Sequence, residues 1–108
     1  ISFAEASGLK TRCERVAREY VPAIRSLVST ILVREYGLTQ IETAKKLGTT
    51  QPAVSYYLRS KRGAKLIEDL KSDRKIFNMI KSLARLVYEG KMDEARKMLC
   101  EICRTIEI

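Results

Sequence analysis

The sequence predicts an all-α fold. Apolar residues recur at spacings of three and four along nearly the whole chain, which is the period of an amphipathic helix. Only 5 Gly and 2 Pro interrupt the 108 residues, and they fall at the boundaries of the apolar stripes. A chain of this length with 45% hydrophobic residues can close one modest core. We therefore expect a single helical domain over residues 1–108.

The N-terminal third predicts two helices. A first helix is expected over residues 9–20. Pro22 then either occupies the first turn of a second helix or kinks a continuous one, and we favour a break at this point. The second helix should end at Gly37, and its broad apolar stripe makes it a scaffold for the core. That stripe comprises Ala23, Ile24, Leu27, Val28, Ile31, Leu32 and Tyr36.

Residues 38–63 predict two short helices joined by a tight turn. Thr39 and Glu42 have the spacing of a capping box, in which each side chain accepts a hydrogen bond from the other residue's amide. Gly48 lies where this first helix must end in a left-handed conformation, which glycine adopts without penalty. The predicted buried face of the helix comprises Ile41, Ala44 and Leu47.

The second helix of this pair begins after Gly48. Thr49 and Thr50 are candidate caps, and Pro52 suits a first turn, where its missing amide hydrogen costs nothing. The residues spaced to bury against the preceding helix are Val54, Tyr57 and Leu58, and those left facing outward are Gln51, Ser55, Tyr56 and Arg59. With small Ala44 where the two helices cross, the pattern is that of a helix-turn-helix.

This segment resembles the helix-turn-helix of the phage repressor and Cro group, the XRE-type transcriptional regulators, and of their bacterial and archaeal relatives. The residues that carry the resemblance are Gln40, Ala44, Leu47, the run Gly-Thr-Thr-Gln at 48–51, Val54 and Leu58. The resemblance covers only this part of the chain. It implies a repressor-like bundle and a sequence-specific DNA-binding regulator that acts as a homodimer and is not an enzyme. Pro52 and Thr49 depart from the group, which often has a polar base-contacting residue and a bulky aliphatic there.

The expected DNA contacts divide between base edges and phosphates. Gln51 suits a bidentate contact with adenine, Ser55 can bond several base edges, and Tyr56 can cover a thymine methyl. The predicted base contacts are Thr50, Gln51, Ser55 and Tyr56, and the predicted phosphate contacts are Gln40, Arg59, Lys61, Arg62 and Lys65. The alternatives are a solvated charged loop for the cations and an ordinary polar first-turn residue for Gln40.

Composition favours a polyanionic partner. Lys and Arg number 21 against 13 Asp and Glu, for a net charge of +8, which suits nucleic acid or an acidic membrane surface. We expect no membrane span, because no apolar run approaches about 18 residues. We expect no signal peptide, because the start shows no succession of charged, apolar and small residues. Double-stranded DNA in the cytoplasm is the expected partner. Scarce Asn and Gln with abundant Lys, Arg and Glu are typical of proteins from organisms that live at high temperature. The resemblance implies a prokaryotic, archaeal member of the group.

Residues 64–108 predict a C-terminal helical extension. A short helix through Leu66, Ile67 and Leu70 should precede a hairpin, whose first helix Asp73 can cap and whose turn contains Gly90. The apolar stripes of the hairpin are Ile76, Phe77, Ile80, Leu83, Ala84 and Val87, then Ala95, Leu99, Ile102 and Ile106. Because these exceed the needs of a small DNA-binding unit, the region is a candidate dimerisation surface. The alternative is packing within the chain.

The 3 cysteines are Cys13, Cys100 and Cys103, and the chain has no histidine. Cys100 and Cys103 are three apart on one helical face and could bind one zinc ion or an iron–sulfur cluster, with Cys13 joining if the chain ends meet. Core packing is the interpretation we favour, so no cofactor is expected. A disulfide switch and a metal- or redox-sensing regulator remain open.

Two other classes of function remain as alternatives to a DNA-binding regulator. One is a protein-interaction module, such as an antitoxin or a bridging factor that carries a helix-turn-helix. The other is a thiol redox enzyme, which we disfavour because Cys100 and Cys103 lie late in a helix rather than at its activating N-terminus.

Overall fold

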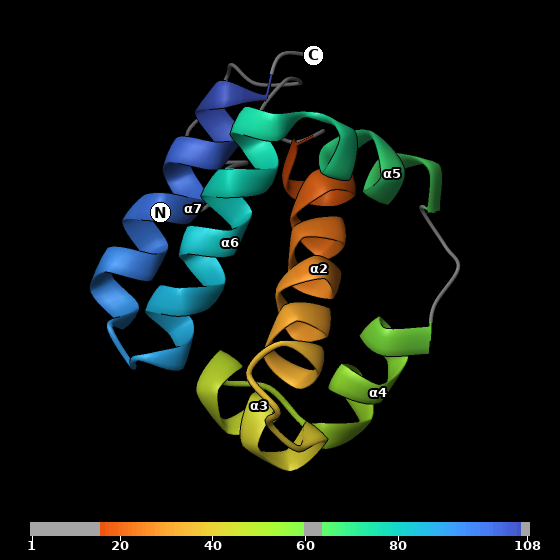
Figure 1. Ribbon diagram of the computed structural model, residues 1–108, viewed down its shortest axis with the longest axis vertical. Coiled ribbons are helices and arrows are strands. Elements are labelled where there is room, and N and C mark those ends of the chain that lie inside the picture. The colour runs from red at the N-terminus through yellow and green to blue at the C-terminus, as the bar shows by residue number, and fades with distance from the viewer. Residues whose placement is uncertain (1–15, 60–63, 107–108) are drawn as a thin grey trace.

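The computed structural model describes residues 16–59 and 64–106, and all their regular structure is helical (Figure 1). The elements are a π-helical turn η1 (Val16–Tyr20), then α2 (Val21–Arg34), α3 (Gln40–Leu47), α4 (Gln51–Arg59), α5 (Ala64–Ser72), α6 (Arg74–Tyr88) and α7 (Met92–Thr105). The all-α prediction is confirmed. Most of the helix expected over residues 9–20 lies outside the described residues, as do Cys13, Lys61 and Arg62.

A new helix begins beside Pro22, as predicted, but no loop separates it from the helical turn before it. Tyr20 has φ −88° and ψ −35°, so the chain stays helical from η1 into α2, and Pro22 occupies the first turn of α2. Proline removes one helical hydrogen bond, and its ring crowds the carbonyl four residues earlier. A π turn has wider hydrogen bonding than an α turn. The turn before Pro22 therefore accommodates the proline without interrupting the helix.

The scaffold helix α2 runs through the middle of the molecule, as predicted. Figure 1 shows α6 and α7 along one side of it, α5 at its upper end and α3 and α4 at its lower end. The buried core cluster comprises Ala23, Ile24, Leu27, Val28, Ile31, Leu32, Leu70, Ile76, Ile80, Leu83, Ala84, Val87, Ala95, Ile102 and Ile106. Each large side chain buried this way stabilises the fold by about 1.5–3 kcal/mol.

Helices α6 and α7 form the predicted hairpin. Asp73 Oδ1 accepts a hydrogen bond from the Ile76 amide at 3.1 Å, and Gly90 between the helices has φ +79°. The apolar residues of the hairpin lie mostly in the core, and Tyr88 is its one large apolar residue, among those described, that is exposed. The buried stripes of α6 and α7 therefore pack on each other, and α6 also packs on α2.

Aromatic rings join α3 to the hairpin. The rings of Tyr36, just after α2, and Tyr88, at the end of α6, stack with centroids 4.5 Å apart. Lys46, in the last turn of α3, places Nζ 5.5 Å from the centroid of the Tyr88 ring. Such stacked and cation–π contacts each contribute about 0.5–1 kcal/mol at exposed sites. The C-terminal ends of α2, α3 and α6 therefore meet at one place.

Candidate nucleic-acid interface

Helix α3 begins with the complete capping box predicted from Thr39 and Glu42. The Glu42 amide donates to Thr39 Oγ1 at 3.1 Å, and the Thr39 amide donates to Glu42 Oε1 at 2.9 Å. The bond from the Thr39 backbone is the largest cause that lowers the pKa of Glu42, followed by the bond with the Thr39 side chain and the attraction of Lys46 and Lys45. The carboxylate of Glu42, the acidic residue of α3, therefore accepts a backbone hydrogen bond at the start of the helix.

The stability contributed by this cap should be lost in acid. Because folding lowers the pKa of Glu42 below 4.5, the contribution is complete above that value and disappears as pH falls through the folded-state pKa. Gln at the same position keeps an acceptor that does not titrate. We expect the melting temperature of Glu42→Gln to rise relative to wild type as the pH is lowered from about 6 to about 3.

Glu68→Gln on α5 is the matched control, since Glu68 is an exposed carboxylate without an ion pair to the described residues. Its melting temperature should follow that of wild type through the same pH range. A difference between wild type and Glu42→Gln that does not change with pH would contradict the prediction.

The turn between α3 and α4 has the geometry predicted for Gly48. This residue has φ +71° and ψ +35°, its amide donates to Lys45 O at 3.3 Å, and the Thr49 amide donates to Ala44 O at 2.9 Å. Thr50 Oγ1 then accepts from the Ala53 amide at 3.3 Å and caps α4, as predicted. The Thr50 hydroxyl oxygen thus accepts a hydrogen bond within the protein, and the hydroxyl hydrogen can still be donated to a base.

The buried face of α4 is the predicted one, whereas that of α3 is partly different. On α4, Val54 is fully buried and Tyr57 and Leu58 are half-buried, as predicted. On α3, however, Ile41 is 59% exposed, and Thr43 is buried in its place. The described buried or half-buried residues Thr43, Ala44 and Leu47 share a helical face that is centred away from Ile41.

The predicted outward-facing residues of α4 lie largely as expected. Gln51, Tyr56 and Arg59 are exposed, and Ser55 is half-buried. The Tyr56 ring, 46% exposed, meets the Tyr57 ring edge to face at 6.4 Å between centroids. The exposed side of α4 therefore combines an amide, a hydroxyl and an aromatic ring within two helical turns.

A hydrogen bond joins the N-terminal residues of α3 and α4. Gln51 Nε2 donates to Gln40 Oε1 at 2.5 Å, across 11 residues of sequence. Gln40 and Gln51 are the first residues of α3 and α4, at helix ends where the dipole favours an anion. The bond leaves the Gln51 carbonyl oxygen and one of its N–H hydrogens for another partner. The structure thus brings together a predicted phosphate contact and a predicted base contact.

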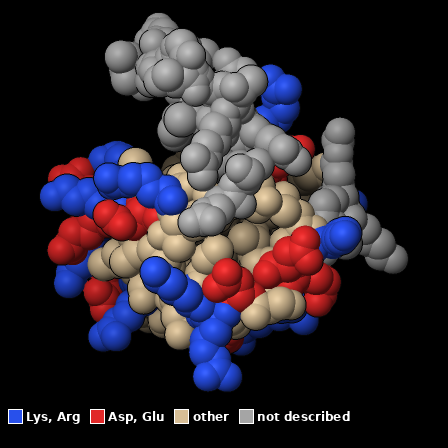
Figure 2. Space-filling view, turned by 90° about the horizontal axis from the view of Figure 1, so that it is seen from above, with Lys and Arg blue, Asp and Glu red and all other residues tan. Residues whose placement is uncertain are grey.

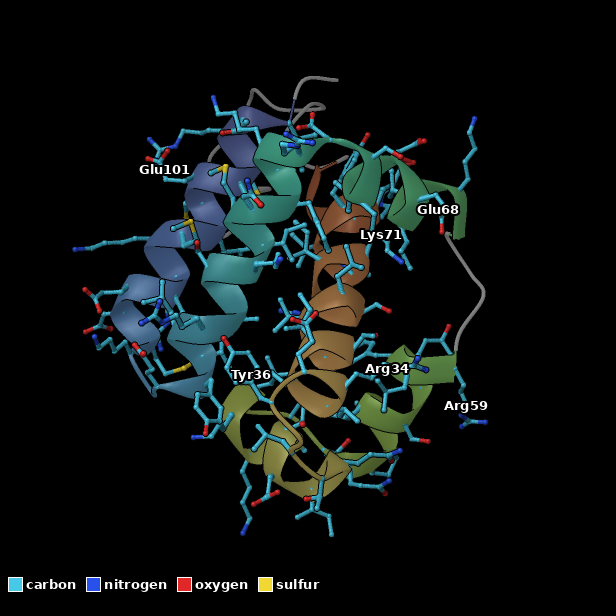
Figure 3. All side chains as sticks on the ribbon, in the orientation of Figure 1. Arg34, Tyr36, Arg59, Glu68, Lys71 and Glu101 are labelled. Carbon is cyan, nitrogen blue, oxygen red and sulfur yellow. The ribbon has the colours of Figure 1, made fainter. Side chains whose placement is uncertain are left out.

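The charged residue of α4 is a cation. Helix α4 contains no acidic residue and ends at Arg59, which has no ion pair among the described residues and points away from the molecule in Figure 3. The described ion pairs instead lie at α6, α7 and their connection, for example Arg96 with Asp93. Figure 2 shows basic and acidic side chains interspersed at the end of the molecule opposite α3 and α4. Arg59 is therefore available to an anion.

The structure does not bring Lys65 to the other predicted phosphate contacts. Lys65 is exposed in the first turn of α5. Figure 1 shows α5 beside the upper half of α2 and α4 beside the lower half. Residues 60–63 between these helices, which include Lys61 and Arg62, lie outside the described part of the chain. Arg59 and Gln40 are the predicted phosphate contacts placed at the α3–α4 end.

The cysteine predictions are only partly addressed by the structure. Cys100 is exposed and Cys103 is half-buried on α7. Core packing is therefore wrong for Cys100, because the buried face of α7 runs through Ala95 and Ile102 and Cys100 lies off it. Within residues 16–59 and 64–106, no cluster of three Cys, Asp or Glu side chains is arranged to hold a metal.

Compared with protein-family models, characterised proteins and solved structures, the chain matches none of them. Among the described helices, none has the length and apolar character needed to cross a bilayer. The side chains that α3 and α4 present are therefore the features that bear on function.

Proposed function

We propose that this protein is a sequence-specific DNA-binding transcriptional regulator, in which α3 and α4 form a helix-turn-helix and α4 enters the major groove. The hydrogen bond between Gln40 and Gln51 is the observation that carries the proposal. Adenine presents an acceptor and a donor side by side in the major groove, which is the arrangement that a glutamine amide matches. Gln40 orients that amide and itself stands at the helix end best suited to a phosphate.

The other outward-facing groups of α4 supply the remaining contacts. Ser55 follows Gln51 by one helical turn and bonds a neighbouring base edge, and the exposed Tyr56 ring covers a thymine methyl. Arg59 binds a phosphate at the end of α4, where it contributes affinity and salt dependence rather than sequence discrimination. Pro52 is exposed in the first turn but offers no polar group, so base reading depends on few side chains.

The regulator acts as a two-fold dimer in the cytoplasm, since one such unit reads only a few base pairs. Paired half-sites would lie about 34 Å apart, one turn of DNA, or a multiple of it. The apolar faces of α6 and α7 are occupied within the chain, which makes the outer, polar surfaces the places to seek the subunit contact.

Selection from a random double-stranded DNA library tests the proposed function. Wild type should enrich one sequence motif that contains adenine, whereas Gln51→Ala/Ser55→Ala should retain weak salt-dependent binding and lose the motif. The matched control is Asn78→Ala/Ser82→Ala, which truncates an exposed amide and an exposed hydroxyl on α6. It should enrich the wild-type motif. A wild-type protein that enriches no sequence, or a Gln51→Ala/Ser55→Ala variant that keeps the motif, would overturn the proposal.

A further inference from the structure

Helix α4 is bonded to the scaffold helix α2 through Ser26. Ser26 Oγ donates a hydrogen bond to the Tyr57 carbonyl oxygen at 2.8 Å, across 31 residues of sequence. Thr30 Oγ1 donates instead to the Ser26 carbonyl within α2. Val54 is the fully buried residue of α4, but it is not part of the large apolar cluster. The Ser26 bond therefore joins α4 to the scaffold outside that cluster.

The Tyr57 carbonyl lies in the last described turn of α4, which the structure describes as far as Arg59. Ser26 supplies a side-chain donor to this carbonyl from α2. At the other end of the same helix, Gln51 is bonded to Gln40 of α3. Helix α4 is thus attached at both ends, and Ser55 lies between the two attachments.

We propose that Ser26 is a positioning residue for DNA recognition, which fixes the C-terminal end of α4 so that Gln51 and Ser55 meet the bases together. This inference rests on the proposed function. Hydrogen bonds to base edges weaken steeply when distance or angle departs from the optimum. Without the Ser26 bond, a smaller fraction of molecules has Gln51 and Ser55 both placed to bond their bases. The apparent affinity for the specific sequence falls in proportion to that fraction.

Ser29 provides a matched control for Ser26. It is the same residue type on the same helix and is fully buried, but its hydroxyl has no hydrogen-bond partner among the described residues. Ser26→Ala should weaken binding to the selected sequence about fivefold, as expected for one lost hydrogen bond. Ser29→Ala should leave it unchanged, and Ser26→Thr, which keeps the hydroxyl, should restore it.

Two further readouts separate positioning from general destabilisation. Binding to an unrelated duplex should change less than about twofold in Ser26→Ala, because phosphate contacts do not require base register. In the free protein, the amides of α4 should exchange hydrogen faster in Ser26→Ala and at the wild-type rate in Ser29→Ala.

The outcomes distinguish this inference from the proposed function. If wild type binds a specific sequence but Ser26→Ala binds it equally well, or loses specific and unrelated DNA to the same extent, the positioning role is overturned and the proposed function stands. If wild type prefers no sequence, both the proposed function and the recognition role of Ser26 are overturned. If the α4 amides of Ser26→Ala exchange hydrogen at the wild-type rate, the Ser26–Tyr57 bond does not hold α4 in place.

Discussion

Replacement of Leu32 by alanine is expected to lower the free energy of unfolding by about 3 kcal/mol, within the usual range of about 2–5 kcal/mol for buried leucine. Leu32 is 0% exposed and belongs to the core cluster to which α2, α6 and α7 all contribute residues. The truncation removes apolar contacts and leaves a cavity, because helices on several sides cannot all move inward. Urea denaturation followed by circular dichroism would measure the loss.

Ile41→Ala is the control for this core prediction. Ile41 is a large aliphatic residue like Leu32, but it is 59% exposed on α3. Its truncation should change the free energy of unfolding by no more than about 0.5 kcal/mol. A loss as large as that of Leu32→Ala would mean that Ile41 faces the core, which contradicts the observed rotation of α3.

Truncation of Gln51 to alanine should weaken binding to the selected DNA sequence by about 10- to 100-fold, the effect of one bidentate base contact. Gln40→Ala should also weaken binding, because the Gln51 amide then loses the partner that orients it. Since the two side chains share a hydrogen bond, the double variant should lose less than the two single losses together. Fluorescence anisotropy titrations of wild type and the three variants would measure this coupling.

A change in the DNA provides the control for the Gln51 contact. Replacing the selected adenine by 7-deazaadenine removes the N7 acceptor and leaves base pairing intact. Wild type should bind this DNA more weakly than the natural sequence, whereas Gln51→Ala should bind both alike. Strictly additive losses for Gln40→Ala and Gln51→Ala, or equal sensitivity of wild type and Gln51→Ala to the modified base, would show that the paired amides do not read adenine.

The sequence by itself determined the features that depend on neighbours along the chain. The Thr39–Glu42 capping box and the Asp73 cap each join residues three apart, and Gly48 and Gly90 end helices through their own backbone angles. Amphipathic spacing likewise predicted the helices through α2–α7 within a few residues. These features are local, so the residue types and their spacing are sufficient to specify them.

Only the tertiary structure decided which face of each helix is covered and which polar groups meet. Ile41 has a spacing compatible with burial, yet the packing of α3 turns Thr43 inward and leaves Ile41 in solvent. The buried apolar residues of α7 pack against α6, and those of α6 also meet α2, which spacing along the chain does not specify.

The same holds for the bonds that set the candidate site. The Gln40–Gln51 and Ser26–Tyr57 bonds join residues 11 and 31 positions apart. Their formation depends on how whole helices cross, which is the sum of many weak packing contacts. The pattern of residues around any one position therefore predicts that such groups exist but not which of them will touch.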